Sequence, residues 1–527
     1  MNRVVLQRAA AQLPRGCPFA PQGGGSSSRA AQAVAPVAVE APASLARETW
    51  PRATAAGGAA SGLRSMSEMP SPPSLPVVGS LFEVLRKGGI SKQYQVLTEY
   101  HQRLGSIYRM RLGSFESVHV GAPHLVESLF RREAACPHRL DIKPWKAYRD
   151  LRGEAYGLLI LDNKPWQKMR RAFQKKLMLP EEVAKYDGKI NEVLSDFVVH
   201  LDATRDAQGG IRDLCLELHK WSFETISYIL YGKRFGLLSQ DMGEEGQIFI
   251  TSIKQMMATF GTMLVTPVGL HRSLNTRTWR VHTEAWDNIF RIAKQCALTR
   301  LGNAQCPGQD LVSQVAQGGV LSPKELYAGV AEMQIGGVET TAVTLMWAIF
   351  HLSRSPRAQQ RLRGEMEALL PPGRAPSAAE MPSLRYLRAC LKESMRLSPT
   401  IPFTSRTLSR ETPIGEYLLP KDTVVMVSNH ALAWSEDYFP NAMSFRPERW
   451  LEDPPGTVKP FSHIPFGFGP RMCIGRRLAE LEIHLALATI VQTYNIVATD
   501  DGPITALHSG TMVPDRKIPV AFVRRRR

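Results

Sequence analysis

Three features that often reveal a function are missing from this sequence of 527 residues. No apolar run near the amino terminus approaches the roughly 18–20 residues that span a bilayer, so we expect no leader-helix anchor. The formal net charge is +17, but it forms no dense basic stripe, which argues against nucleic-acid binding. None of the seven cysteines forms a C-x-x-C pair, which argues against a structural zinc site.

Acidic residues are scarce in the first 67 residues. Glu40 and Glu48 are the only acids there, against seven arginines, and Ala, Ser and Gly are abundant. This composition is typical of a mitochondrial transit peptide, with a disordered tail as the alternative. We therefore expect a leader at 1–67, one folded domain at 68–523 and a basic tail at 524–527.

The hydrophobic pattern predicts a mainly α-helical body with a smaller β part. Ser322-Pro323-Lys324-Glu325 combines an N-cap, a proline in the first turn and a capping box, which predicts a long helix to about Arg354. The other expected elements are helices at Gln93–Leu104, about Ser383–Leu397 and from near Cys473, and strands at Ile107–Leu112, Ser117–Val120 and Thr423–Val427.

The segment 465–476, with the sequence PFGFGPRMCIGR, carries the strongest chemical signal. A cysteine thiolate at the start of a helix can ligate haem iron, because free N–H groups and the helix dipole favour the anion. Gly469 permits a tight turn, and Gly475 allows close approach to the porphyrin. Arg471 can pair with a propionate, and Phe466 can shield the sulfur. We predict haem b with Cys473 as axial ligand; a buried cysteine beside a glycine-rich turn is the alternative.

This F-x-x-G-x-R-x-C-x-G loop resembles the haem-binding loop of the cytochromes P-450. The resemblance implies a monooxygenase that uses O2, and a mainly α fold with haem between a long central helix and the cysteine loop. In that helix, Thr340 can bond back to the carbonyl of Gly336, which loosens the helix and opens a groove for dioxygen. Glu339 and Thr340 offer an acid and an alcohol for proton delivery. A glycine-weakened core helix is the alternative.

Two further sets of residues resemble the same family. Glu393, Arg396 and Arg449 are implied to form a buried charge triad, although an isolated Glu-x-x-Arg is usually a surface pair. Trp166 and Arg170, one helical turn apart, are implied to meet a haem propionate, with a solvated arginine as the alternative.

The source of electrons must be a partner, since the chain has no flavin-type GxGxxG fingerprint and no spare cysteine cluster. With a mitochondrial leader, the resemblance implies an acidic adrenodoxin-type ferredoxin, itself reduced by an NADPH-dependent reductase, on the matrix side of the inner membrane. Its predicted docking residues are basic, with solvated faces as the alternative: Arg388, Lys392, Arg476 and Arg477. The apolar stretch Met263–Val268 is expected to touch the membrane surface, or else to be a buried helix end.

Four stretches resemble the mitochondrial vitamin D 24-hydroxylases, and the likeness extends over about 75–523. They are Leu112–His119, Ile142–Asp150, Lys220–Glu224 and Leu507–Thr511. The resemblance implies hydroxylation of 1,25-dihydroxyvitamin D and 25-hydroxyvitamin D at side-chain carbons C24 and/or C23, which inactivates the hormone. The implied pocket suits a rigid apolar ligand with hydroxyl ends and comprises Ile142, Trp145, Met256, Met257, Gly336, Ile401, Phe403, Ser405 and Gly510.

Two other functions stay open at this point. The pocket residues alone do not distinguish vitamin D from other sterols, so a mitochondrial sterol or steroid hydroxylase is one alternative. A haem-thiolate sensor without turnover is a more distant one, against which Glu339 and Thr340 argue. Gly336 departs from the alanine that the resemblance implies at this position in many 24-hydroxylases, and we expect the missing methyl to favour hydroxylation at C23.

Overall fold

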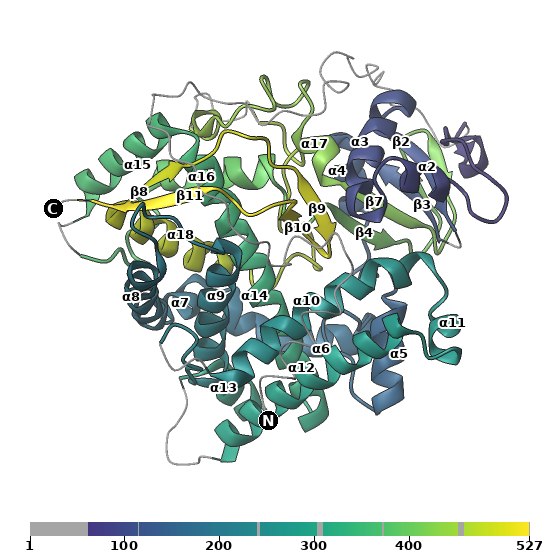
Figure 1. Cartoon of the computed structure of the whole chain (residues 1–527). Coiled ribbons are helices and arrows are strands. Elements are labelled where there is room, and N and C mark those ends of the chain that lie inside the picture. The colour runs from purple at the N-terminus through teal and green to yellow at the C-terminus, as the bar shows by residue number, and fades with distance from the viewer. Residues whose placement is uncertain are drawn as a thin grey trace.

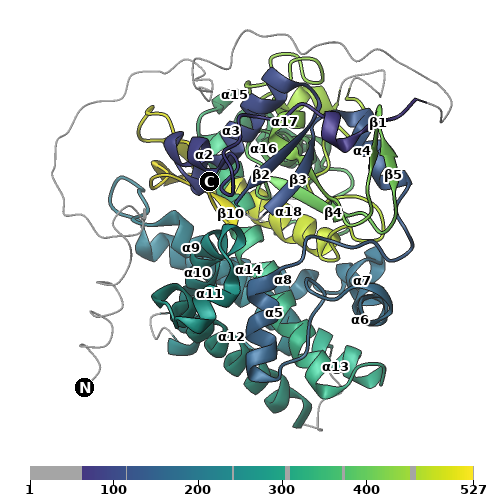
Figure 2. The ribbon, with the colours of Figure 1, turned by 90° about the vertical axis from the view of Figure 1, so that its right-hand side faces the viewer.

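The computed structural model describes residues 62–113, 115–239, 243–302, 309–370, 374–451 and 458–525. Most of the predicted leader and the last two residues of the predicted tail therefore lie outside the described residues. Figure 1 shows helices around the long α14 (Pro323–Ser353), with one pair of strands at the upper left and the largest sheet at the upper right; Figure 2 shows the molecule from its right-hand side. The mainly helical fold with a smaller β part is confirmed.

The helices, in chain order, are α2 (Leu81–Arg86), α3 (Gln93–Leu104), α4 (Pro123–Arg131), α5 (Lys143–Arg152), α6 (Asn163–Leu177), α7 (Pro180–Ala184), α8 (Asp187–Thr204), α9 (Leu214–Tyr231), α10 (Glu244–Val265), α11 (Val268–Ser273), α12 (Arg277–Gly302), α13 (Leu311–Gln317), α14 (Pro323–Ser353), α15 (Pro356–Leu369), α16 (Arg385–Leu397), α17 (Asn429–Ala433) and α18 (Arg476–Thr493). Short 3-10 helices lie at η2 (Met66–Glu68), η3 (Ile90–Lys92) and η4 (Pro447–Trp450).

The strands are β1 (Arg64–Ser65), β2 (Ile107–Leu112), β3 (Phe115–Val120), β4 (Phe403–Thr407), β5 (Thr412–Ile414), β6 (Tyr417–Leu419), β7 (Val424–Ser428), β8 (Tyr494–Ala498), β9 (Ala506–Ser509), β10 (Thr511–Pro514) and β11 (Val520–Arg524). The largest sheet has the order β2-β3-β7-β4. In it β3 and β7 run parallel, with Val118 opposite Val425, and the other neighbours run antiparallel. The β9–β10 hairpin turns at Gly510, whose φ of +83° favours glycine.

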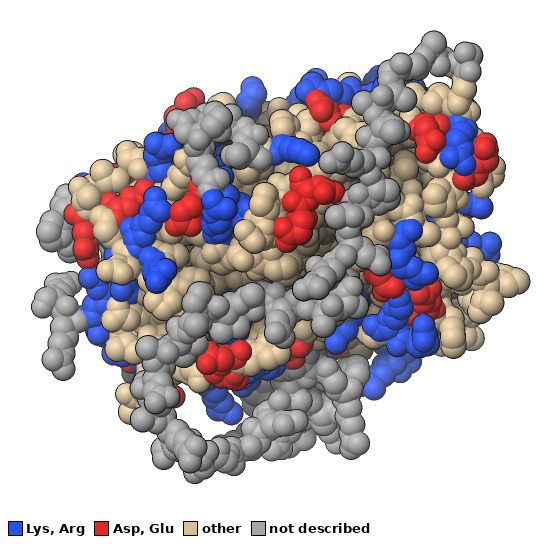
Figure 3. Space-filling view, turned by 90° about the horizontal axis from the view of Figure 1, so that it is seen from above, with Lys and Arg blue, Asp and Glu red and all other residues tan. Residues whose placement is uncertain are grey.

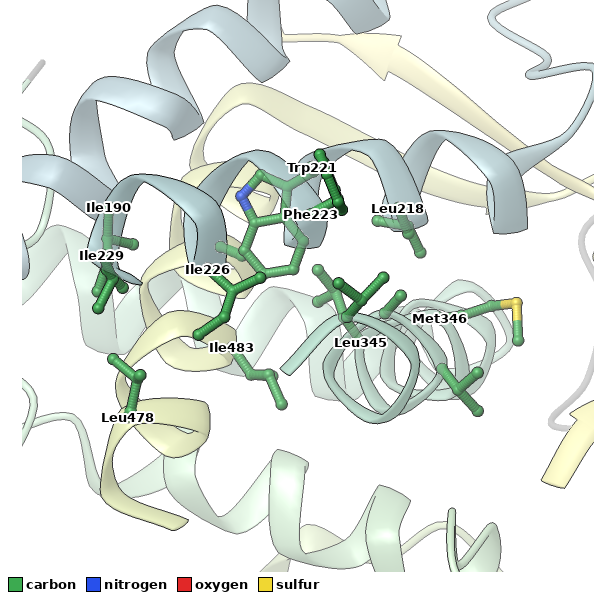
Figure 4. Close-up of a cluster of buried hydrophobic side chains, with 14 of the residues drawn as sticks. Ile190, Leu218, Trp221, Phe223, Ile226, Ile229, Leu345, Met346, Leu478 and Ile483 are labelled. Carbon is green, nitrogen blue, oxygen red and sulfur yellow. The ribbon is translucent and has the colours of Figure 1, made fainter. Parts of the chain in front are cut away.

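Helix α14 is the axis of the core. The Ser322 hydroxyl accepts from the Glu325 N–H at 3.3 Å, and the Glu325 carboxylate accepts from the Ser322 N–H at 2.7 Å. This capping box fixes where the helix begins. Figure 4 shows apolar side chains of α9, among them Leu218 and Ile226, facing Leu345 and Met346 of α14. The buried helix thus holds its neighbours in place by apolar packing.

Two helices within the described part of the chain, α10 and α14, are long and apolar enough to cross a membrane by length and composition alone. Most of α14 is buried inside the protein. A core helix of a soluble protein passes the same test, so this finding is weak evidence for a membrane span.

The predicted elements agree closely with the structure where local signals were strong. Helix α3 and strand β2 have the expected bounds, and α14 ends one residue before Arg354. Two of the described strands extend beyond the expected bounds 68–523. Strand β1 pairs with Tyr417 and Leu418, while Arg524 pairs with Tyr494. Two residues of backbone pairing are too short a signal to be recognised in a sequence.

Candidate active site

The cysteine loop is built by a turn that leads into α18. The Cys473 N–H donates to the Phe466 carbonyl at 2.8 Å. Gly469 has a φ of +75°, and a Cβ there would lie 2.7 Å from a carboxylate oxygen of Glu133, so the turn and the space both require glycine. Helix α18 begins three residues after the cysteine, and the Gly475 N–H hydrogen-bonds to Cys473.

Cations surround the sulfur. Burial raises the pKa of the Cys473 thiol, while the Gly475 N–H, Arg139 and Arg170 act in the opposite direction. Arg406 and Arg471 also act on Arg139, whose pKa is lowered to about 9, chiefly by burial. The four arginines come from the segment before α5, from α6, from β4 and from the cysteine loop itself. Sequence analysis identified two of the four.

The arginine cluster consists of Arg139, Arg170, Arg406 and Arg471. Its four positive charges outnumber the carboxylates that pair with them. Asp162 pairs with Arg471 at 2.5 Å, and Glu133 pairs with Arg406. Within the described residues, neither Arg139 nor Arg170 has a carboxylate partner at salt-bridge distance. Buried cations of this kind require further anions. A haem, with iron for the thiolate and two propionates, is chemically matched to this donor set.

Arg471 and Trp166 connect the loop to the start of α6. The Arg471 guanidinium lies 4.2 Å from the centre of the Trp166 ring and donates to the carbonyls of Pro137, Leu158 and Leu161. Arg170, on the same helix as Trp166, donates to the Met472 carbonyl at 2.9 Å. The structure therefore brings these predicted residues to the cysteine loop, while their contact with a propionate stays a prediction.

Two glycines among the predicted site residues have open space where a side chain would lie. A Cβ added to Gly336 on α14, or to Gly475 at the start of α18, would meet no heavy atom within 4 Å. At the neighbouring Gly337, by contrast, a Cβ would lie 2.7 Å from Ile226. Gly336 is exposed in a helix that is otherwise largely buried. Open space beside these glycines suits the close approach of a flat group.

The two predicted relay residues of α14, Glu339 and Thr340, are both hydrogen-bonded. Thr340 donates to the Gly336 carbonyl at 2.5 Å, as predicted, yet the helix continues without interruption through this bond. The Glu339 carboxylate bonds instead to His219 at 2.7 Å and Thr511 at 2.9 Å. His219 and Thr511 carry no local motif, so sequence reasoning missed both. Proton delivery by Glu339 and Thr340 stays a prediction.

The predicted triad meets in the interior beside α16. Both oxygens of Glu393 accept from Arg396, at 2.8 and 3.0 Å, and one accepts from Arg449 at 3.0 Å. The Trp450 indole N–H adds a bond at 2.9 Å, and the Arg446 N–H one at 3.0 Å. All three charged side chains of the triad are buried. Five donated bonds to one carboxylate make Glu393 the junction of α16 and η4.

The predicted substrate residues lie on α5, α10, α14, β4 and the β9–β10 hairpin. A Cβ at Gly510 would lie 2.5 Å from the Met257 sulfur, so the hairpin turn is pressed against α10. Phe403 packs edge-on to His508, with ring centres 5.9 Å apart. The buried Trp145 packs on Phe260 of α10 at 5.7 Å. The others also lie at or near these elements: Ile142, Met256, Gly336, Ile401 and Ser405.

The predicted docking residues share a surface formed by α16 and α18. Burial lowers the pKa of Lys392, and the charges of Arg388 and Arg476 lower it further. This effect shows that the three cations lie close together. Arg388, Lys392, Arg476 and Arg477 are all exposed, and Glu480 pairs with Arg476 at 3.2 Å. Figure 3 shows one face of the molecule, on which basic and acidic side chains are interspersed.

Comparison with known proteins agrees with this geometry. The cytochrome P-450 family model matches residues 69–522. The chain belongs to the cytochrome P-450 family. Family membership makes haem its cofactor, and the cysteine loop, the arginine cluster and the bare glycines fit that group.

Several curated relatives of this cytochrome P-450 are mitochondrial enzymes. The chain is 55% identical over 460 residues to the mitochondrial 1,25-dihydroxyvitamin D(3) 24-hydroxylase of Mus musculus, covering 87% of this chain and 89% of the relative. It is 33% identical to the mitochondrial 25-hydroxyvitamin D-1 alpha hydroxylase of Homo sapiens, with 88% and 93% covered. It is 31% identical to the mitochondrial sterol 26-hydroxylase of Mus musculus, with 86% and 89% covered.

The triad gives a prediction about stability. In Glu393→Gln, Arg396 and Arg449 keep their charges but lose the carboxylate, which costs about 3–5 kcal/mol. We expect a lower yield of haem-loaded protein and a lower denaturant midpoint, followed by the Soret band and circular dichroism. Glu127→Gln breaks the exposed pair with Arg131 and serves as control, with an expected change of at most about 1 kcal/mol. Equal effects of the two substitutions would show that the triad is not a major source of stability.

Proposed function

We propose that this cytochrome P-450 is a mitochondrial monooxygenase that hydroxylates the side chain of 1,25-dihydroxyvitamin D and 25-hydroxyvitamin D at C24 and/or C23, and so inactivates the hormone. The observation that carries the proposal is the 55% identity to a vitamin D 24-hydroxylase, against 31% to a sterol 26-hydroxylase. In this proposal residues 1–67 contain the leader that directs the chain to the matrix, and residues 68–523, with strand β1 and the tail 524–527, form the enzyme.

Residues of the chain would hold the haem and move protons in the proposed reaction. When bound, haem supplies the redox chemistry by which one atom of O2 enters a C–H bond. Cys473 would ligate the iron, and Arg139 and Arg170, with Arg471, would hold the propionates. Thr340, whose proton is donated to Gly336, keeps its oxygen lone pairs available to accept a proton. Glu339, the preceding residue, is the proposed acid that exchanges protons toward that hydroxyl.

The pocket elements suit a rigid secosteroid. Apolar groups from α5, α10 and β4 supply most of the surface, and a few polar groups can bond hydroxyls. The Trp145 indole nitrogen is buried without a hydrogen-bond partner among the described residues. A substrate hydroxyl would satisfy that donor, which costs free energy while it is unpaired.

Product analysis tests the proposed substrate. The holoenzyme is combined with adrenodoxin-type ferredoxin, its reductase and NADPH, and is offered 1,25-dihydroxyvitamin D, 25-hydroxyvitamin D, cholesterol and a corticosteroid. Mass spectrometry should find C24- or C23-oxidised secosteroid, and none with Cys473→Ala, which also loses the thiolate-type Soret band of its reduced carbon monoxide complex. Faster turnover of cholesterol or the corticosteroid would favour the sterol hydroxylase. No product from any substrate would favour the sensor.

Gly336 supplies a prediction about regiochemistry. A Cβ at this position meets open space, so Gly336→Ala places one methyl in the proposed pocket without a clash. One methyl changes the fit by about 1 kcal/mol, which is about fivefold in the ratio of two competing products. We expect the C23-to-C24 ratio to fall by that factor, measured by mass spectrometry.

Gly364→Ala is the matched control for the regiochemistry. Gly364 also lies in a helix, α15, with open space at its Cβ position, and α15 contributes none of the proposed pocket residues. Its product ratio should equal that of the wild type. An unchanged ratio in Gly336→Ala would show that the position does not control the site of hydroxylation.

Electron delivery is the second part of the proposal. We expect an acidic ferredoxin to dock on Arg388, Lys392, Arg476 and Arg477. Reversing Arg388 and Lys392 to Glu should weaken ferredoxin binding at least tenfold and leave substrate binding unchanged. In the wild type, binding should weaken as salt rises, because surface charges are screened over about 8–10 Å at physiological ionic strength.

Fluorescence titration with labelled ferredoxin measures this binding. Arg280→Glu with Arg291→Glu is the control, since both side chains are exposed on α12 and the change in net charge is the same. Equal loss of affinity in the two double variants would indicate a general effect of net charge. Unchanged affinity in Arg388→Glu with Lys392→Glu would place the docking surface elsewhere.

Peripheral contact with the inner membrane is the third part. Large apolar side chains are exposed near α2 and α11, including Val77, Phe82, Leu270 and Leu274. Both helices lie on the right-hand side in Figure 1, which faces the viewer in Figure 2. The predicted stretch Met263–Val268 joins α10 to α11. Exposed apolar groups on one side support a surface that rests on lipid.

A further inference from the structure

One face of α9 contacts the back of α14 where the proposed proton-relay residues lie. His219, Ser222 and Ile226 are spaced at i, i+3 and i+7 and so share that face. His219 bonds to Glu339. The Ser222 hydroxyl donates to the carbonyl of Val338 at 2.9 Å, and Ile226 fills the space beside Gly337. Consecutive residues of α14 are therefore held by consecutive turns of α9.

The hydrogen bonds of His219 define its protonation. Its Nδ1 lies 2.5 Å from the Cys215 carbonyl oxygen, which can only accept, so Nδ1 carries a proton. Its Nε2 lies 2.7 Å from one carboxylate oxygen of Glu339. The other Glu339 oxygen accepts from the Thr511 hydroxyl at 2.9 Å. Both oxygens are thus fixed, one by an imidazole from α9 and one by a hydroxyl from β10.

The surroundings favour the charged form of the pair. His219 is 1% exposed and Glu339 is 5% exposed. Burial alone would lower the pKa of His219, but Cys215 and Glu339 outweigh it and raise that pKa to about 10, against the opposing charge of Lys254. Burial alone would raise the pKa of Glu339, whereas His219, Lys254 and Thr511 lower it. The pair is therefore an imidazolium and a carboxylate at neutral pH.

We propose that His219 is a positioning residue for the monooxygenase reaction, which holds Glu339 in place as a carboxylate and supplies the proton that Glu339 passes toward Thr340. The inference rests on the proposed relay role of Glu339 and Thr340. It adds a residue from a different helix, 120 positions earlier in the chain, to that relay.

The proton steps balance within the chain and solvent. The Glu339 carboxylate takes the proton from Nε2 of His219, so an N–H bond breaks and an O–H bond forms. Glu339 then passes this proton toward Thr340 and becomes a carboxylate again. His219 is then neutral and keeps its Nδ1 proton on the Cys215 carbonyl. Water supplies the replacement proton to Nε2, and no electrons are exchanged in these steps.

A purely structural role is the competing explanation, and the chain contains a matched control for it. His200 on α8 lies 2.6 Å from a carboxylate oxygen of Glu217 on α9 and is also buried. This second histidine–glutamate pair has a comparable separation and burial. It has no contact with Glu339 or Thr340 among the described residues.

Oxygen coupling tests the proposal. Product and hydrogen peroxide per NADPH are measured in the reconstituted holoenzyme for the wild type, His219→Gln, Glu339→Gln, the double variant and His200→Gln. In His219→Gln, coupling should fall about tenfold, the equivalent of one lost charge-assisted hydrogen bond. In His200→Gln it should equal that of the wild type, even if the thermal midpoint falls equally. The double variant should couple no worse than Glu339→Gln, because His219 acts through Glu339.

The pH profile gives a readout that a structural role would not move. Below the pKa of His219 the imidazolium is present, so wild-type coupling should be constant from pH 6 to about 8.5 and fall only as pH rises toward 10. Without the imidazolium, burial raises the pKa of Glu339. We therefore expect a new ionisation in the profile of His219→Gln, at a higher pH than that of Glu339 in the wild type.

If His219→Gln fails to fold, infrared spectroscopy can still test whether Glu339 is a carboxylate in the wild type. The difference spectrum of the wild type minus Glu339→Gln should contain no protonated-carboxyl band between pH 6 and 8.5, and the appearance of such a band would overturn the proposal. Wild-type coupling and pH profile in His219→Gln would also overturn it. If Glu339→Gln couples like the wild type, the relay itself is wrong; if Glu339→Gln alone uncouples, only the role of His219 fails.

Discussion

Buried positive charge beside Cys473 is the constraint on which the architecture depends. Arg170, Arg406 and Arg471 are all buried, and they belong to segments far apart in the chain. Taking a cation out of water is costly unless an anion faces it. Asp162 and Glu133 compensate part of this charge. The remainder is the electrostatic reason that the fold suits an anionic cofactor with a thiolate ligand.

The two sides of α14 differ in packing: one is packed against α9, and the other is open at Gly336 and Thr340. Toward α9 the helix is fully packed, with a serine hydroxyl on the Val338 carbonyl and Ile226 against Gly337. On its open side Gly336 has no side chain and Thr340 is only half-buried. Helix α14 is uninterrupted from Pro323 to Ser353, so its open side is shaped by the residues it carries, such as the bare Gly336, rather than by a break in the backbone.

A buried charge is also compensated by partners from other elements at the triad and at the His219–Glu339 pair. Glu393 joins α16 to η4 through two arginines, and Glu339 joins α14 to α9 and β10. In each case one buried carboxylate is surrounded by donors from separate elements. Removal of a single partner leaves the others uncompensated, which is why such networks hold geometry more strongly than surface ion pairs.

The sequence by itself determined the elements whose signals are local. The spacing around Cys473, the capping box at Ser322 and the period of α3 each lie within one short segment, and backbone sterics act over that same range. Glu393 and Arg396 were also recognisable, because they lie one turn apart on α16. The family resemblance then indicated which distant residue, Arg449, joins them.

Only the tertiary structure decided which distant side chains compensate one another. Glu133 pairs with Arg406 across 273 positions, and Glu339 with His219 across 120. Neither partner stands out in its own segment, because a histidine or arginine on a helix or strand is most often solvated. Burial by the finished fold removes that solvent and makes the pairing necessary, so these contacts follow from the packing of whole elements and not from any local pattern.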